Sequence, residues 1–251
     1  MQAKILLIDV ETSPSLGYVW GMYEQNVIEF KSQWYIMCFG AKWLGEKTVV
    51  KALPDYTLYK KNRENDKDLV KDIWRLMDEA DIIIAHNGNK FDFKKINSRF
   101  AIHGLPPPSP YKAIDTCLVA RRYFGFLSNK LDDLGNELGL GRKVKHSGFE
   151  MWKGCMSGNL FSWQEMKKYN KQDVDLLEKV YLHFRGWMHT HPNVSNLLSK
   201  TCCPKCGSRN LHSKGFHFTQ VGKYRRFQCQ DCGGYGRVRL NEQEDNINTN
   251  A

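Results

Sequence analysis

Residues 4–12 read KILLIDVET, in which four apolar residues precede the acids Asp9 and Glu11. A run that is apolar at successive positions predicts a central strand, because both faces of such a strand are buried. Side chains two positions apart on a strand point to the same face, so both carboxylates could reach one metal site. The pattern is not specific by itself, since many strands end in acids that only reach solvent.

Outward from this strand, the sequence predicts further strands before the first helix and then an alternation of strands and helices. Short apolar or β-branched runs between turn residues predict strands at 35–44, 48–53, 81–86 and 113–115. Apolar spacing and end signals predict helices at 66–79, 91–103, 116–123 and 131–138. This order is typical of a mixed α/β fold in which helices pack on a sheet.

A last helix is predicted to begin at Ser162, because Glu165 follows three residues later in the spacing of a capping box. The helix is expected to run to about Met188, with a candidate break near Asn170. Residues 1–190 would then form one domain, which is an ordinary size for a single hydrophobic core.

The C-terminal part of the chain differs in charge from the rest. The chain has 251 residues and a formal net charge of +10, and residues 200–240 hold nine Lys and Arg against one acid. Residues 191–199 read as a linker, and the polar tail 241–251 is expected to be disordered. So basic a segment indicates nucleic acid as the partner, whereas the alternative is a charge excess that only aids solubility.

No segment of the sequence is typical of a membrane span or a signal peptide. The longest apolar runs, 5–8 and 82–85, are far shorter than the roughly 20 residues that cross a bilayer. The N-terminus meets an acid at Asp9 before it can form the apolar core of a signal peptide. We therefore expect no membrane partner and a cytoplasmic protein with reduced thiols, of cellular origin or encoded by a phage in a bacterial host.

Two later segments also carry acids at positions where they could serve as catalytic or metal-binding residues. One is His86-Asn87-Gly88-Asn89-Lys90-Phe91-Asp92, which follows a buried strand and opens a helix. The other pairs Tyr169 with Asp173, four residues apart and therefore on one face of a helix. Each has an ordinary explanation, because acids are favoured at helix N-termini and a Tyr beside a solvated Asp is common at a core edge.

Together, these segments resemble the three motifs of the DEDD exonucleases. The resemblance rests on Asp9-Val10-Glu11-Thr12, then Asn87 with Phe91-Asp92, then Tyr169 with Asp173, and it covers about residues 4–185. In having a tyrosine at the third motif, the sequence resembles the DEDDy branch, to which the proofreading domains of family-B DNA polymerases belong. The resemblance implies an RNase H-like fold, a mixed β-sheet flanked by helices, and 3′→5′ exonuclease activity.

The resemblance also implies a catalytic site for two Mg²⁺ or Mn²⁺ ions. Carboxylates without His or Cys form a hard oxygen site, which favours these ions over Zn²⁺. Two ions about 4 Å apart can activate a water molecule and stabilise the leaving oxygen of a phosphodiester. The implied metal ligands are Asp9, Glu11, Asp92 and Asp173.

Other residues of the motifs receive roles from the same resemblance. Tyr169 would orient or help to activate the attacking water. Thr12, Asn87 and Phe91 match positions that lie near the terminal nucleotide in relatives. We assign Asp115 a structural role, as the cap of the helix that follows it, rather than a place in the metal site.

The cysteines predict a second, structural metal site. Five of the eight lie between 202 and 232, which in a cytosolic chain indicates metal binding. Two Cys-x-x-Cys-Gly segments predict a small β zinc-ribbon module at 200–240 that folds around one Zn²⁺. Cys202 is an alternative first ligand, but Cys203 keeps the two-residue spacing. The predicted zinc ligands are Cys203, Cys206, Cys229 and Cys232.

The segment between the two cysteine pairs interleaves basic and aromatic residues, a pattern that suits a nucleic-acid strand. Arg225 and Arg226 are the predicted contacts. The module resembles zinc ribbons of nucleic-acid enzymes and of some transposases. The alternative is that it docks a replication or recombination protein.

The sequence as a whole favours a stand-alone metal-dependent 3′→5′ exonuclease that acts on DNA, with single-stranded ends as its substrate. A 3′→5′ exoribonuclease is an alternative, because such a site contacts phosphate and sugar more than bases. A zinc-ribbon DNA-binding protein with an inactive nuclease fold is a third hypothesis, although all four carboxylates are present. A transposase is a fourth, but it would normally need a late catalytic Glu, whereas the late acid here is Asp173. The aromatic residues at 30–39 are interpreted as core residues, with base stacking as the alternative.

Overall fold

The computed structural model describes residues 3–23, 26–142, 146–197 and 202–239. The chain divides into two compact units, one of which spans Lys4–Tyr181, while the other contains the residues from Leu182 onward. The predicted tail at 241–251 and part of the predicted linker lie outside the described residues. No helix in the described part of the chain is both long enough and apolar enough to cross a membrane.

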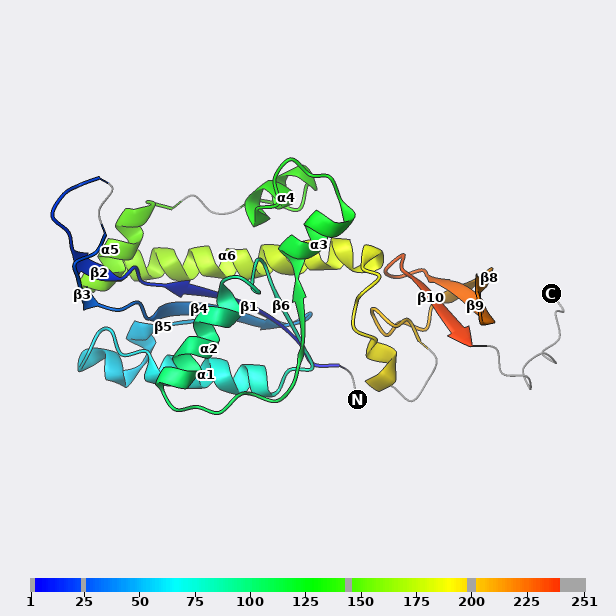
Figure 1. Cartoon of the computed structure of the whole chain (residues 1–251), viewed down its shortest axis with the longest axis horizontal. Helices are drawn as coiled ribbons and strands as arrows, with labels where there is room; N and C mark the ends of the chain where they lie inside the picture. Colours follow the sequence, from blue (N-terminus) through cyan, green and yellow to red (C-terminus); the bar gives the residue numbers. More distant parts are fainter. Residues whose placement is uncertain (1–2, 24–25, 143–145, 198–201, 240–251) are drawn as a thin grey trace. The chain divides into compact units, whose positions relative to one another are not determined.

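A five-stranded sheet forms the centre of the larger unit (Figure 1). Its strands are β1 (Ile5–Thr12), β4 (Ile36–Trp43), β5 (Val49–Ala52), β6 (Ile82–Ala85) and β7 (Lys112–Asp115). Their order across the sheet is β5-β4-β1-β6-β7. β1 is central because it pairs antiparallel with β4 and parallel with β6. All five predicted strands are present, and the predicted α/β class with a mixed sheet is confirmed.

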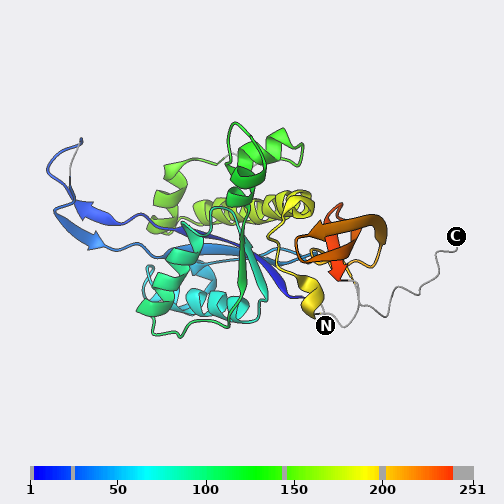
Figure 2. The same ribbon diagram turned by 45° about the vertical axis from the view of Figure 1, so that its right-hand side comes forward.

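Helices cover both faces of this sheet (Figures 1 and 2). α1 and α2 lie on one face, and α6 lies across the other. The helices are α1 (Lys67–Asp78), α2 (Asp92–Ile102), α3 (Thr116–Tyr123), α4 (Leu131–Glu137), α5 (Phe149–Ser157) and α6 (Leu160–Phe184), with 3₁₀ turns at Leu53–Asp55 and Thr57–Lys60. The sheet is therefore the middle layer of three, as expected for an RNase H-like fold.

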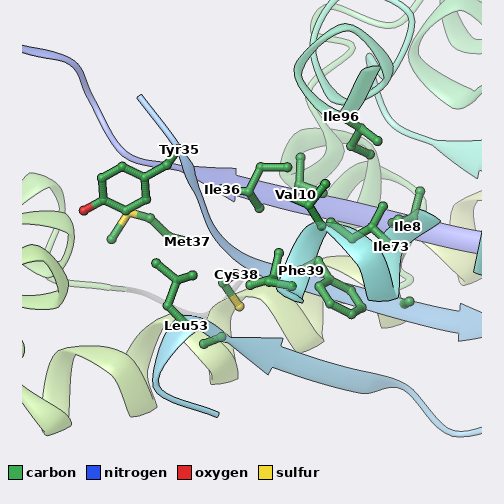
Figure 3. Close-up of a cluster of buried hydrophobic side chains, with 14 of the residues drawn as sticks. Ile8, Val10, Tyr35, Ile36, Met37, Cys38, Phe39, Leu53, Ile73 and Ile96 are labelled. Atoms are coloured by element: carbon green, nitrogen blue, oxygen red, sulfur yellow. The ribbon is translucent and has the colours of Figure 1, made fainter. Parts of the chain in front are cut away.

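The alternation of side chains along β1 sets the orientation of the acids. Leu6, Ile8 and Val10 belong to the core cluster that β1 and β4 form with α1 and α2 (Figure 3). Since successive side chains on a strand point to opposite faces, Asp9 and Glu11 face the other layer, which is that of α6. The strand thus buries one row of side chains in the core and presents its carboxylates to a helix.

The last helix departs from the prediction at its start and in its middle. It begins at Leu160 rather than Ser162, because Asn159 Oδ1 accepts the backbone N–H groups of residues 161 and 162 at 2.9 and 3.2 Å. The predicted capping box is wrong, since the Glu165 carboxylate accepts hydrogen bonds from Ser147 instead. The predicted break at Asn170 is also wrong, and the helix ends at Phe184, where a 3₁₀ turn, Arg185–Trp187, follows.

A two-stranded hairpin between β1 and β4 has no counterpart in the prediction. It consists of β2 (Leu16–Tyr18) and β3 (Glu29–Ser32), and its apolar side chains are largely exposed. Trp20, near its tip, is 89% exposed. Of the aromatic residues at 30–39, Tyr35 and Phe39 lie in the core as predicted, whereas Phe30 on β3 is exposed.

The smaller unit contains a three-stranded antiparallel sheet of order β10-β9-β8. Its strands are β8 (Leu211–Thr219), β9 (Gly222–Cys229) and β10 (Tyr235–Arg239), and a 3₁₀ turn, Val194–Leu197, precedes them. Few apolar side chains are buried among these strands; Phe227 is one. So small a core predicts that the unit depends on its cysteines for stability.

Candidate active site and metal centre

Three acids from two distant segments meet on the face of the sheet that α6 covers. Asp9 and Glu11 of β1 and Asp173 of α6 each offer a carboxylate oxygen, and these oxygens lie within 4.8 Å of one another. Asp173 is buried, whereas Asp9 and Glu11 are partly exposed. Oxygen donors at this spacing match the preference of Mg²⁺ and Mn²⁺.

Asp92 lies beside this group, at the first residue of α2. Its Oδ1 accepts the backbone N–H of Val10 at 3.1 Å, and Val10 is the residue between the two acids of β1. The side chain is 2% exposed, and the positive end of the α2 dipole favours its negative charge. Asp92 is not one of the three acids that come within 4.8 Å of one another.

Asn170 is a site residue that the sequence analysis missed. Its Nδ2 donates to Asp9 Oδ2 at 2.6 Å, which fixes the orientation of that carboxylate. The side chain is fully buried, and the helix approaches β4 so closely there that a Cβ added at Gly40 would lie 2.5 Å from Asn170 Oδ1. The available signal was a polar residue between Tyr169 and Asp173 on a helix that is buried on one side.

Tyr169 lies one turn before Asp173 on α6 and packs against two other rings. The His146 ring centroid is 4.7 Å from that of Tyr169, and the Trp152 centroid is 6.4 Å away. His146 Nδ1 accepts the backbone N–H of Gly148 at 3.1 Å. These contacts restrict the Tyr169 ring, so its hydroxyl has a defined direction.

A cleft of about 670 Å³ opens beside Asp9. Its walls carry the basic side chains Arg121 and Lys130 as well as the apolar Leu127. The cleft therefore combines one acid of the candidate metal site with cations that can neutralise phosphates. Its lining is Asp9, His86, Asn87, Cys117, Arg121, Leu127, Ser128, Asn129, Lys130, Leu131 and Asp132.

The loop after β6 is held in an unusual conformation at the edge of this cleft. Asn87 has a positive φ of 62°, and its backbone N–H donates to Asp115 Oδ1 at 2.9 Å. Asp115 also accepts the backbone N–H groups of Cys117 and Leu118, which confirms the predicted cap of α3. One carboxylate thus ties the β6 loop to the start of α3.

Of the three residues predicted to lie near a terminal nucleotide, one lines the cleft. Asn87 lines the cleft with Asp9. Thr12 ends β1 at an irregularity in the pairing with β4, directly after Glu11. Phe91 precedes Asp92 and is exposed, and the Lys95 ammonium lies 5.8 Å from its ring centroid. These three residues are therefore distinct from the acid cluster of Asp9, Glu11 and Asp173.

The four predicted zinc ligands come together in the smaller unit. The sulfur atoms of Cys203, Cys206, Cys229 and Cys232 lie within 4.8 Å of one another. Gly207 and Gly233, which follow the two cysteine pairs, have positive φ values of 76° and 69°, a conformation that glycine adopts without strain. The donor set and its clustering fit a tetrahedral Zn²⁺ site.

Geometry separates Cys203 from its neighbour Cys202. The Cys203 sulfur lies 3.6 Å from that of Cys232 and belongs to the four-sulfur cluster. Cys202 is not in that cluster, and burial raises the pKa of its thiol. Its place in the cluster therefore favours Cys203 as the ligand.

The two predicted nucleic-acid contacts of this unit do not share a surface. Arg225 and Arg226 are both exposed and adjacent on β9, so their side chains point to opposite faces of the sheet. Arg225 is opposite Phe216 of β8, whereas Arg226 is opposite Arg237 of β10. One strand of nucleic acid on one face would therefore contact one of the pair.

The sequence model of the RNase H superfamily matches residues 8–185. This region contains the central sheet from within β1 onward, the helices on both of its faces, and the four acids of the candidate site. No curated protein matches the sequence. Since the match covers most of the chain and coincides with the larger unit, the chain belongs to the RNase H superfamily.

Proposed function

We propose that this protein is a metal-dependent 3′→5′ exonuclease that hydrolyses DNA from single-stranded ends. The observation that carries the proposal is the meeting of Asp9, Glu11 and Asp173, from two segments far apart in sequence, beside a cleft that Asp9 lines together with Arg121 and Lys130. The 3′→5′ direction rests on the resemblance of the motif set, with its Tyr169, to the DEDDy exonucleases. We assign the activity to residues 1–190 and the zinc ribbon to 200–240, with 191–199 as the linker.

Four carboxylates would together ligate two Mg²⁺ or Mn²⁺ ions. Asp9, Glu11 and Asp173 would bind at the shared position, and Asp92, fixed by the Val10 amide, would complete the ligand set. Such ions, when bound, lower the pKa of a water molecule and neutralise charge on the leaving oxygen. Asn170 holds the Asp9 carboxylate in one orientation, so that less ordering is needed when a metal binds.

The remaining residues bind the substrate and orient the water. The Tyr169 hydroxyl, whose ring packs against His146 and Trp152, would form a hydrogen bond with the attacking water, either as donor or as acceptor. Arg121 and Lys130 would contact the phosphates of the strand that enters the cleft. Thr12, Asn87 and Phe91 would contact the terminal nucleotide, with the exposed ring of Phe91 available to a base.

Direction and substrate can be tested on oligonucleotides of one sequence. The full chain is incubated with Mg²⁺ or Mn²⁺ and with 5′-labelled or 3′-labelled single-stranded DNA. We expect a ladder that shortens from the 3′ end with the first label and immediate release of a mononucleotide with the second. Circular single-stranded DNA, which has no end, should stay intact, and an Asp9→Ala preparation controls for contaminating nucleases.

The same assay separates the alternatives. Faster shortening of RNA than of DNA of the same sequence would make the protein an exoribonuclease. Cleavage of the circle would exclude an exonuclease. Failure to hydrolyse either nucleic acid with either ion, by protein that retains its zinc and its fold, would support a DNA-binding protein with an inactive nuclease fold.

A further inference from the structure

The three-stranded sheet of the smaller unit has two faces of different chemistry. Residues that pair across neighbouring antiparallel strands have their side chains on the same face, so the register assigns each side chain to a face. We call one the phenylalanine face, and its residues are Phe216, Phe218, Lys223 and Arg225. We call the other the arginine face, and its residues are His217, Tyr224, Arg226, Tyr235 and Arg237.

Side-chain contacts agree with this assignment. On the arginine face, the Arg237 guanidinium lies 4.9 Å from the Tyr224 ring centroid, and His217 is 6.5 Å from the same ring. On the phenylalanine face, the Lys223 ammonium lies 3.9 Å from the Phe216 centroid and 5.9 Å from that of Phe218. None of these contacts joins one face to the other.

Each cation of the phenylalanine face has an aromatic residue directly opposite it. Lys223 is opposite Phe218, and Arg225 is opposite Phe216. A cation beside an aromatic ring is stabilised by the ring's negative face. Arg237 has a comparable contact with the Tyr224 ring on the arginine face, so the two faces differ in what lies opposite each cation rather than in cation–ring contact.

The arginine face places two cations directly opposite each other. Arg226 of β9 pairs with Arg237 of β10, and both side chains are exposed. Like charges in directly opposite positions destabilise a sheet. The one acid among residues 202–239 is Asp231, which follows β9 and accepts a hydrogen bond from Asn210. An arginine pair of this kind is favourable once an anion lies between the two guanidinium groups.

Aromatic rings lie on both sides of this arginine pair. Tyr224 is two residues before Arg226 on β9, and Tyr235 is two residues before Arg237 on β10. Tyr235 is 53% exposed. Residues two apart on a strand are roughly 7 Å apart, so rings and guanidinium groups alternate across the face. Alternation of stacking rings and phosphate-binding cations is the chemistry that holds unpaired nucleotides.

We propose that the arginine face binds single-stranded nucleic acid. A phosphate lies between Arg226 and Arg237, and the flanking bases stack on Tyr224 and Tyr235. The face shares no residue with the carboxylate site and its binding needs no hydrolysis, so binding can be measured whether or not the nuclease proposal holds. Arg225, on the phenylalanine face, does not contribute.

The test compares equal losses of charge on the two faces. The full chain, with zinc bound and no other divalent ion added, is titrated against fluorescent single-stranded DNA and the anisotropy is followed. The double variant Arg226→Ala/Arg237→Ala should bind on the order of tenfold more weakly, because both guanidinium contacts to one phosphate are lost. Its plot of log K against log salt should flatten by about 0.7, the value for one neutralised phosphate on a single strand. The control, Lys223→Ala/Arg225→Ala, should change neither quantity.

A second pair of variants tests stacking. Tyr235→Leu should weaken binding at least about fivefold, since one stacked base is lost, while Tyr235→Phe should bind like the wild type. The loss should occur with the unpaired strand and not with a duplex of the same sequence, whose bases are already stacked on one another. Equal losses with both substrates would contradict stacking.

Stability distinguishes binding from a structural role. Removing one of two opposed cations should leave the smaller unit equally stable or stabilise it, so Arg237→Ala should not lower the melting temperature or the zinc content. A lower melting temperature together with zinc loss would make the pair structural and overturn the proposal. Equal weakening by the two double variants would show unspecific charge attraction and would also overturn it. Unchanged binding by all variants would indicate a protein partner instead.

Discussion

The side-chain amide of Asn170 donates a 2.6 Å hydrogen bond to the carboxylate of Asp9, across 161 positions of sequence. Asn170 also lies between Tyr169 and Asp173 on α6, so one helical segment carries the proposed metal ligand Asp173, the proposed water-orienting Tyr169 and the side chain that supports Asp9. The bond explains why the helix continues through Asn170. Its side chain is engaged with β1 rather than competing for the backbone of its own helix.

Asn170→Ala should weaken metal binding. Without the amide, the Asp9 carboxylate must be ordered by the metal itself, and loss of such a supporting partner typically costs about 10–100-fold in metal affinity or activity. The measurement is the Mn²⁺ concentration that gives half-maximal hydrolysis, together with Mn²⁺ binding by calorimetry. Gln172→Ala, which removes another amide of the same helix, is the control and should change neither value. Identical behaviour of the two variants would contradict the role of Asn170.

Tyr169→Phe should lower turnover less than the loss of a metal ligand does. The phenyl ring keeps its packing against His146 and Trp152, so the fold is unchanged and only the hydroxyl is lost. We expect a decrease of at most about 100-fold, at the low end of what a positioned acid–base group contributes. The rate at saturating substrate and metal is the quantity to compare. A variant as inactive as Asp9→Ala would show that the tyrosine does more than orient the water.

One Zn²⁺ per chain should be bound, and it should depend on Cys206 but not on Cys202. Cys206 belongs to the cluster whose sulfur atoms lie within 4.8 Å of one another, and Cys202 does not. Cys206→Ser should therefore release zinc and unfold the smaller unit, while Cys202→Ser should retain both. Metal analysis and circular dichroism of reduced protein measure this. Zinc loss in both variants would mean that the first ligand is shared or misassigned.

Asp66 should contribute strongly to the stability of the larger unit. It is fully buried and accepts hydrogen bonds from the Ile36 N–H, Arg99 and His103. Asp66→Ala leaves the Arg99 charge buried without its partner, so we expect a loss of about 3–5 kcal/mol in the free energy of unfolding.

The control for Asp66 is Asp68→Ala, also near the start of α1. Asp68 pairs with Lys71 at the surface, and such a pair is worth at most about 1 kcal/mol. Urea unfolding of both variants measures the difference. Similar losses in the two would show that the buried Asp66 contacts add little.

The fold class and the acids were predictable because they leave local signals. β1 and β6 are apolar at successive positions, Asp9 and Glu11 end the first run and Asp92 follows the second, while Asp173 was identified by its helical spacing from Tyr169. Asn170 leaves only a weak local signal, a polar residue between Tyr169 and Asp173, since its role depends on a strand far away in sequence. The predicted start of α6 was wrong for a related reason. Asn159 and Ser162 are both residue types that cap helices, and the Glu165 carboxylate accepts a hydrogen bond from Ser147 rather than from the helix backbone.

The exposed hairpin and the faces of the small sheet also required the structure. Burial governs the patterns that identify strands, and β2 and β3 do not bury their apolar side chains, so no alternation marks them. The adjacent arginines of β9 look like one basic patch in sequence, but strand geometry sends them to opposite faces. The bulge at residues 213–216 shifts the register of β8 by one residue, which cannot be seen from the spacing of basic residues alone.

The most direct test of the metal-dependent site compares two acids of α6 that lie two residues apart. Asp173 meets Asp9 and Glu11, whereas Asp175 accepts hydrogen bonds from Thr48 and Lys171 outside the site. Mn²⁺-dependent release of nucleotides from 3′-labelled single-stranded DNA is measured for the wild type, Asp173→Asn and Asp175→Asn. We predict that Asp173→Asn lowers the rate at least about 1000-fold, since several kcal/mol of charge stabilisation are lost, and that Asp175→Asn keeps nearly the wild-type rate. Wild-type turnover by a folded Asp173→Asn protein would contradict the account.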